Sequence, residues 1–184
     1  MPNSSLNVNV GKPAIAGAIF RAPVGTSLPV DATTALTNDW VCVGYISADG
    51  VTNGNALDSE NTKAWGGDVI YTMNNGRTDT WQFTMVESMN EEAMKVYFGD
   101  DNVTKDASGN ITITVNSKDL GSHSYVIDEI LRDNRAKRIV IPIGQVSATE
   151  DINYRDNEII SYGVTVTGAL DSAGNTHYEY IAAA

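Results

Sequence analysis

Cysteine is almost absent from this chain of 184 residues, in which Cys42 stands alone. A single thiol cannot close a disulfide within the chain, which excludes a disulfide framework and fits assembly in a reducing cytoplasm. Cys42 lies in the apolar run of residues 40–43, where we expect it to serve as a small buried hydrophobic residue. A nucleophilic thiol would need a nearby histidine, and neither histidine is close in sequence.

Long hydrophobic runs are also missing. The longest, residues 14–20 and 139–143, have the length of strands, whereas a membrane-spanning helix needs about 18 apolar residues. The first five residues lack the basic region and apolar block of a signal peptide. We therefore expect no membrane association, and we expect the small, polar residues 1–10 to form a flexible N-terminal arm.

Positive charge is scarce, with 12 Lys and Arg against 23 Asp and Glu and a formal net charge of −11. Such a surface repels the phosphates of nucleic acids and anionic membranes. This charge balance disfavours a protein that grips DNA, but not one past which DNA slides.

Catalytic signatures are missing as well: there is no phosphate-binding loop, dinucleotide fingerprint or nucleophile elbow. His123 and His177 fall on separate predicted strands, too few for a zinc site even with Cys42. Residues 106–110 loosely resemble a calcium loop but lack its closing glutamate, and turn formation explains their composition. We expect no enzyme, no cofactor and no metal.

The patterns that are present indicate one antiparallel β domain over residues 11–184. Strands are expected over residues 12–21, 40–47, 68–73, 78–87, 111–115, 123–131, 137–146, 158–167 and 176–181. The Asn75-Gly76 pair predicts a tight hairpin turn between the third and fourth of these strands. In the fourth, Trp81, Phe83 and Met85 alternate with polar residues, as in a half-buried strand.

One helix is expected over residues 88–98, starting at a Ser88–Glu91 capping box and stopping at Gly99. By contrast, residues 49–67 show neither a strand nor a helix period and are predicted to form a long functional loop. Trp65 in this loop either anchors it on its own domain or contacts another subunit.

Several segments, in order along nearly the whole chain, resemble the major tail tube proteins of siphophages, especially those from phages and prophages of Gram-positive bacteria. They are residues 11–13 (GKP), 17–23 (GAIFRAP), 44–52 (GYISADGVT), 63–68 (KAWGGD), 86–100 (VES through YFGD), 137–142 (KRIVIP) and 171–176 (DSAGNT).

The resemblance implies two packed antiparallel sheets with a flanking helix, in subunits that form hexameric rings stacked into a hollow tube in the virion. It also implies assembly in the host bacterial cytoplasm, a tape-measure protein inside the tube, terminator and tip proteins at its ends, and passage of DNA during ejection. The loop over residues 49–67 would then reach the next ring.

Three sets of residues are candidates for these contacts. The lumen or subunit-seam candidates are Asp68, Thr72, Asp79, Thr80, Gln82 and Thr84. The ring-stacking candidates are Asp49, Asn53, Asn55, Asp58, Glu60, Lys63 and Trp65. The basic residues Arg132, Arg135, Lys137 and Arg138 form either a salt-bridging edge against an acidic neighbour or a solvated turn.

Two other classes of function stay open on the residues alone. A β-sandwich module that binds carbohydrate or a receptor would be a stable monomer with an exposed aromatic patch, for instance around Trp65. A hydrolase with a carboxylate pair would need a deep pocket and a perturbed acid, for which the sequence offers no specific candidate.

Overall fold

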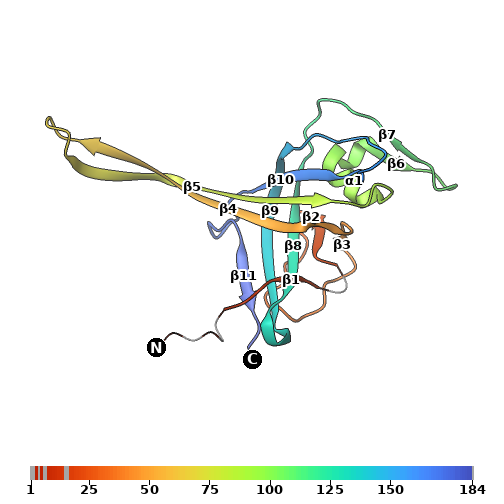
Figure 1. Cartoon of the computed structure of the whole chain (residues 1–184), viewed down its shortest axis with the longest axis horizontal. Coiled ribbons are helices and arrows are strands. Elements are labelled where there is room, and N and C mark those ends of the chain that lie inside the picture. Colours follow the sequence, from red (N-terminus) through yellow and green to blue (C-terminus); the bar gives the residue numbers. More distant parts are fainter. Residues whose placement is uncertain (1–2, 4, 6–7, 15–16, 184) are drawn as a thin grey trace.

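The computed structural model describes residues 3, 5, 8–14 and 17–183 and is mainly β, as predicted (Figure 1). Most of the predicted N-terminal arm thus lies outside the described residues. The elements are β1 (Lys12–Pro13), β2 (Ile19–Pro23), β3 (Val41–Cys42), β4 (Ile46–Lys63), β5 (Val69–Met85), α1 (Glu91–Phe98), η2 (Asp100–Asn102), β6 (Val103–Lys105), β7 (Ile111–Ile113), β8 (Ser122–Ile130), η3 (Arg132–Asn134), β9 (Ala136–Thr149), β10 (Tyr162–Gly168) and β11 (Tyr178–Ile181).

The strands form two antiparallel sheets of very different size. The large sheet has the order β3-β2-β8-β9-β10-β5-β4, with β1 added on β8 and β11 added on β9. The second sheet is the hairpin of β6 and β7. The strand predicted over residues 12–21 is split into β1 and β2, with residues 15 and 16 outside the described residues.

Both faces of the large sheet carry a core. On one face, β2, β5, β8, β9 and β10 supply side chains such as Trp81, Phe83 and Met85, which pack beneath Ala93 and Val96 of α1. Successive strand residues point to opposite faces. Val126 of β8 and Val140 of β9 therefore belong to a smaller cluster on the other face of the sheet. The irregular segment between β2 and β3 covers this second cluster with Leu28 and Leu36. We call the helix-covered side the core face.

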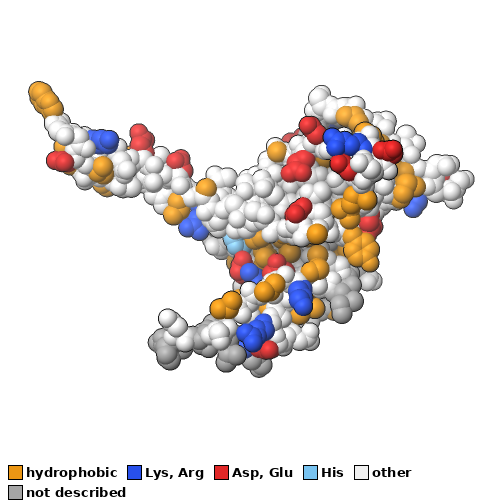
Figure 2. All heavy atoms as spheres, in the orientation of Figure 1, with side chains coloured by type: hydrophobic (Ala, Val, Ile, Leu, Met, Phe, Trp, Pro, Cys, Tyr) orange, Lys and Arg blue, Asp and Glu red, His pale blue; other side chains and the backbone are white. Residues whose placement is uncertain are grey.

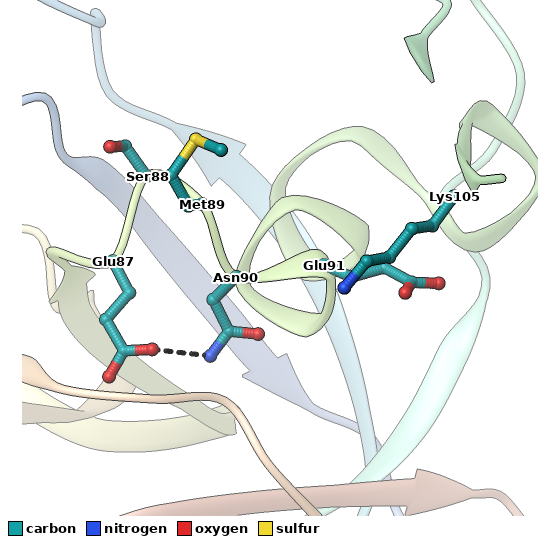
Figure 3. Close-up of a pocket in the computed structure, with 6 residues that line it drawn as sticks. All are labelled: Glu87, Ser88, Met89, Asn90, Glu91 and Lys105. Carbon is teal, nitrogen blue, oxygen red and sulfur yellow. Dashed lines mark hydrogen bonds between the residues drawn. The ribbon is translucent and has the colours of Figure 1, made fainter. Parts of the chain in front are cut away.

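The helix begins later than the sequence predicts. Asn90 is its N-cap and accepts a hydrogen bond from the backbone N–H of Glu92 at 2.9 Å. The Asn90 side-chain amide also donates to Glu87 at 2.8 Å, which fixes the capping side chain in place (Figure 3). The predicted start at Ser88 and its capping box are therefore wrong, since residues 88 and 89 form a turn before the helix.

The predicted end of the helix is confirmed. Gly99 follows Phe98 with φ 95°, and its backbone N–H bonds the carbonyl of Lys95 at 2.9 Å. A positive φ is easy for glycine and strained for other residues, so Gly99 suits this cap. The described part of the chain has no other α-helix.

The largest difference from the sequence prediction lies in residues 49–85. The predicted loop over residues 49–67 is strand β4, which continues through Asp49 and Gly50, and the predicted turn at Asn75-Gly76 lies inside β5. Asp58 pairs with Gly76 and Ser59 with Asn74, so Asn75 is the extra residue of a β-bulge. The chain instead reverses at residues 64–68, where the Ala64 N–H bonds the Asp68 carbonyl at 2.8 Å.

Candidate assembly site

The β4–β5 hairpin projects far beyond the rest of the molecule (Figure 1). Pairing of β5 with β10 ends at Thr80 opposite Thr167, and beyond this point β4 and β5 pair only with each other. Residues 55–78, which we call the extension, are all exposed. A two-stranded hairpin is marginally stable on its own in water, so such an element gains order from a partner.

The outer part of the extension is rich in exposed apolar side chains, visible at its far end in Figure 2. The side chain of Trp65, in the turn, is fully exposed, with a relative accessibility of 105%. The other large apolar residues exposed in this outer part are Val69, Ile70, Tyr71 and Met73, and Leu57 is exposed nearer the root of the extension. Clustered exposed apolar residues mark interaction sites in soluble proteins.

The ring-stacking candidates mostly lie on this extension. Asn55, Asp58, Glu60, Lys63 and Trp65 belong to it, whereas Asp49 and Asn53 lie on the part of β4 nearer the body. The sequence prediction does not include the apolar residues of β5 among the contacts. The polar residues 49–67 predict a loop, and the Asn75-Gly76 pair predicts a separate short hairpin.

Three of the lumen or seam candidates share one face of the large sheet. Thr80, Gln82 and Thr84 point away from the core face, opposite Thr167, Thr165 and Gly163 of β10. On β9, Ser147 joins them: its hydroxyl accepts from Thr167 at 2.8 Å. The polar face, as we call it, consists of Thr52, Thr80, Gln82, Thr84, Gln145, Ser147, Thr165 and Thr167, and none of these residues is charged.

The other three lumen candidates lie elsewhere. Asp68 is in the turn of the extension, and Thr72 lies within it and donates to Asn61 at 2.7 Å. Asp79 is on the core face and only 1% exposed. The six candidates therefore do not form one surface in the single subunit.

The basic candidates are largely engaged within the chain. Arg138 is 5% exposed and forms a bidentate pair with Asp128, at 2.7 and 2.9 Å. Lys137 pairs with Glu179 at 3.1 Å, and Arg132 donates to the Ser5 carbonyl at 3.3 Å. Arg135 has a buried Nε that has no hydrogen-bond partner among the described residues. Arg138 thus ties the sheet together internally.

Two depressions on the body are large enough for a small molecule. One, of ≈490 Å³, opens at the helix start between residues 87–91 and Lys105 (Figure 3). The other, of ≈370 Å³, is lined by Arg21, Glu92, Asp100 and His123, among others. These four side chains are already paired with one another, because Arg21 contacts both carboxylates and His123 contacts Asp100 at 2.8 Å.

The electrostatics of the second depression do not suit acid catalysis. Partial burial raises the pKa of Asp100, but hydrogen bonds from His123 and Arg21 outweigh it and hold the pKa at about 2. A general acid needs a raised pKa near the working pH. Among the described residues, no group of three or more His, Cys, Asp and Glu side chains is placed to hold a metal ion. The helix of the described chain is too short and polar to cross a membrane.

Comparison with known proteins decides the family. The family model for phage tail tube proteins matches residues 5–184. The chain belongs to the phage tail tube protein family. This tail tube protein is therefore a structural component of a phage tail, as its resemblance to siphophage tube proteins predicts.

The other comparisons add little to this assignment. No curated protein sequence matches the tail tube protein. A cryo-EM structure of the anti-feeding prophage cap, a tube-terminating cap, is similar over 96% of each chain, with 9% identity and a TM-score of 0.49.

Proposed function

We propose that this protein polymerises as stacked hexameric rings into the hollow tail tube of a long-tailed phage, through which DNA is ejected. The observation that carries the proposal is the extension, in which each of residues 55–78 is exposed and which ends in an uncovered tryptophan. An isolated subunit gains nothing from such an element, whereas a second copy would bury it.

In this assembly the extension contacts the adjacent ring, and Trp65 is its central anchor. Aromatic residues in fully desolvated pockets carry much of the binding energy at protein interfaces. Other residues of the extension, nearer the body than Trp65, would provide further contacts: apolar Leu57 and Met73 and charged Asp58 and Glu60.

The polar face would line the lumen. It carries hydroxyl and amide groups and no Lys or Arg, so it offers no cation to pair with passing phosphates. The net charge of −11 on each subunit makes the conduit negative as a whole, which keeps DNA mobile. The tape-measure protein would occupy the lumen during assembly in the host cytoplasm, with terminator and tip proteins at the two ends.

The first test is electron microscopy of the purified protein at increasing concentration, with light scattering. We expect hollow tubes from the native protein, and we expect Trp65→Ala to raise the concentration needed for assembly at least about tenfold, as loss of an interface anchor does. Because Trp65 is fully exposed, its loss should leave the unfolding free energy within about 0.5 kcal/mol.

The matched control is Tyr154→Ala, which removes an exposed aromatic ring outside the extension. It should assemble like the native protein. A strict monomer at every concentration, even with tail-tip complexes as seeds, would contradict the proposal. If sugars then quenched Trp65 fluorescence, the protein would be a carbohydrate-binding module instead.

A further inference from the structure

The root of the extension contains a buried charge. Asp79 is the residue of β5 just beyond its last pairing with β10 at Thr80, so it stands where the extension leaves the sheet. Its side chain is 0% exposed. Burying a carboxylate costs several kcal/mol unless charged or hydrogen-bonding groups compensate. An exposed position of β5 would accept any polar residue without this cost. The buried position of Asp79 therefore requires partners that compensate for the lost hydration.

Donors from two parts of the chain, β4 and the segment just before β11, converge on this carboxylate. The Asn53 side-chain amide of β4 donates to one oxygen at 2.7 Å. His177 Nδ1 lies 2.6 Å from the other oxygen, and Thr176 also hydrogen-bonds Asp79. Because Asn53 also donates to the Thr80 carbonyl at 3.1 Å, the two strands of the hairpin are joined at the same point.

The surroundings hold His177 in place. Its ring packs edge-on against Trp81, with the ring centres 5.1 Å apart. His177 immediately precedes β11, which is paired with β9 in the body of the sheet. A side chain added at Gly168 would meet the Thr176 carbonyl at 3.3 Å and Asp79 at 3.5 Å, so the backbones approach closely here. The root of the extension is thus linked to the part of the sheet where β11 pairs with β9.

We propose that Asp79 and His177 are positioning residues that fix the direction in which the extension leaves the body. The inference rests on the proposed function for its biological use, since the extension would be the contact to the next ring. The link between the two residues, which we call the clasp, spans 98 positions of sequence. It holds the extension at one angle before any partner is bound.

Geometry explains why this angle matters. From Asp79 to the turn the extension runs about 12 residues, or roughly 40 Å at the rise of a β-strand. A rotation of about 10° at the root would therefore move Trp65 by about 7 Å. Such a displacement exceeds what a specific interface tolerates, whereas a pre-oriented extension avoids the entropy cost of ordering on contact.

The test measures the orientation of the extension in the full-length free subunit. Spin labels at Asp68→Cys in the turn and Lys118→Cys on the body, in a Cys42→Ser background, report the distance between them. We expect His177→Ala and Asp79→Asn to widen this distance distribution about twofold. His177→Gln, which keeps a hydrogen-bond donor, should restore part of the native distribution. The clasp variants should also raise the concentration needed for tube assembly.

The matched control is Lys137→Ala, which breaks an ion pair on β11 without touching Asp79. It should leave the distance distribution unchanged. An unchanged distribution in both folded clasp variants would overturn the inference, as would equal widening in the control. Because the distance is measured on free subunits, failure of the native protein to form tubes would count against the proposed function and not against the clasp.

Discussion

At the scale of single residues, the strongest electrostatic cluster joins the helix end to the sheet. Arg21, on β2, is 6% exposed and is neutralised by Glu92 of α1 and by Asp100 just after it. His123 on β8 contacts Asp100 from the other side. Removing one partner of such a network leaves the others partly buried and unpaired, which costs more than the pair itself contributes.

This cluster predicts a specific dependence of stability on pH. The folded-state pKa of Asp100, about 2, lies below its ordinary value of 3.8. A depressed pKa stabilises the fold fully above the ordinary value, and that contribution is lost as the pH falls from 3.8 towards 2. Urea unfolding across this range should show a steeper loss of stability for the native protein than for Asp100→Asn.

The matched variant for this measurement is Asp101→Asn, which removes the adjacent carboxylate. It should retain the native slope. Equal slopes for the native protein and Asp100→Asn would show that another acid causes the acid sensitivity.

At the scale of elements, β5 is a single strand with two different roles. Its last part, which ends at Met85, lies in the core, while its first part belongs to the extension and is exposed. Only the buried part contributes to the stability of the free subunit, because burial of apolar surface is the main stabilising term.

Two methionines of β5 test this division. Met85 is 0% exposed and Met73 is 47% exposed. Met85→Ala should lower the unfolding free energy by about 2–5 kcal/mol through loss of packing and cavity formation. Met73→Ala should change it by less than about 0.5 kcal/mol. If chemical denaturation showed a similar loss of unfolding free energy for both variants, the extension would be packed against the body.

The elements also show what sequence patterns can predict. The sequence predicts the burial of Trp81, Phe83 and Met85 because one side of this strand packs in the core and the other side faces solvent. The sequence does not predict β4, because solvent on both sides of the extension leaves no alternation of polar and apolar residues over 55–63. The Asn75-Gly76 pair is a strong local turn signal, yet the long-range pairing of the two strands uses it as a bulge.

The candidate site was predictable only in part, for a related reason. The stacking set, including Trp65, rests on the resemblance to tail tube proteins, and its contact with a neighbouring ring stays a prediction. The sequence does not predict the clasp, since Asp79 and His177 are brought together only by the sheet topology, and an isolated aspartate after a hairpin signal looks like a turn residue.

At the scale of the whole molecule, the polar face is an uncharged surface in an acidic protein with a net charge of −11. Carboxylates lie at its border: Gln145 donates to Asp119 at 2.9 Å, and Glu150 lies over Gly163. Acidic residues are spread over the rest of the molecule, including the extension, the surroundings of the helix and the segment between β9 and β10. A tube built with this face inward would have a hydrated wall that forms no ion pairs with DNA.

Gln82→Lys tests whether the polar face points into the lumen. Repeated around each ring, the added lysine would place a circle of cations in the lumen. We expect assembled tubes of this variant to retain linear double-stranded DNA at low salt and to release it as salt rises, as counterion release requires. Thr104→Lys on β6, outside the polar face, is the matched control. Equal retention by both variants would place residue 82 outside the lumen.

The bulge at Asn75 decides on which side of the extension Tyr71 and Met73 lie. Without the extra residue, Tyr71 and Met73 would continue the alternation of Trp81 and emerge on the side of the core face. With it, both are turned to the side shared by Thr80 and Gln82. A single-residue deletion at this position would therefore move Tyr71 and Met73 to the opposite side of the extension, beside Leu57, while leaving the composition almost unchanged. One residue of backbone thus sets which apolar side chains a partner meets on each side of the extension.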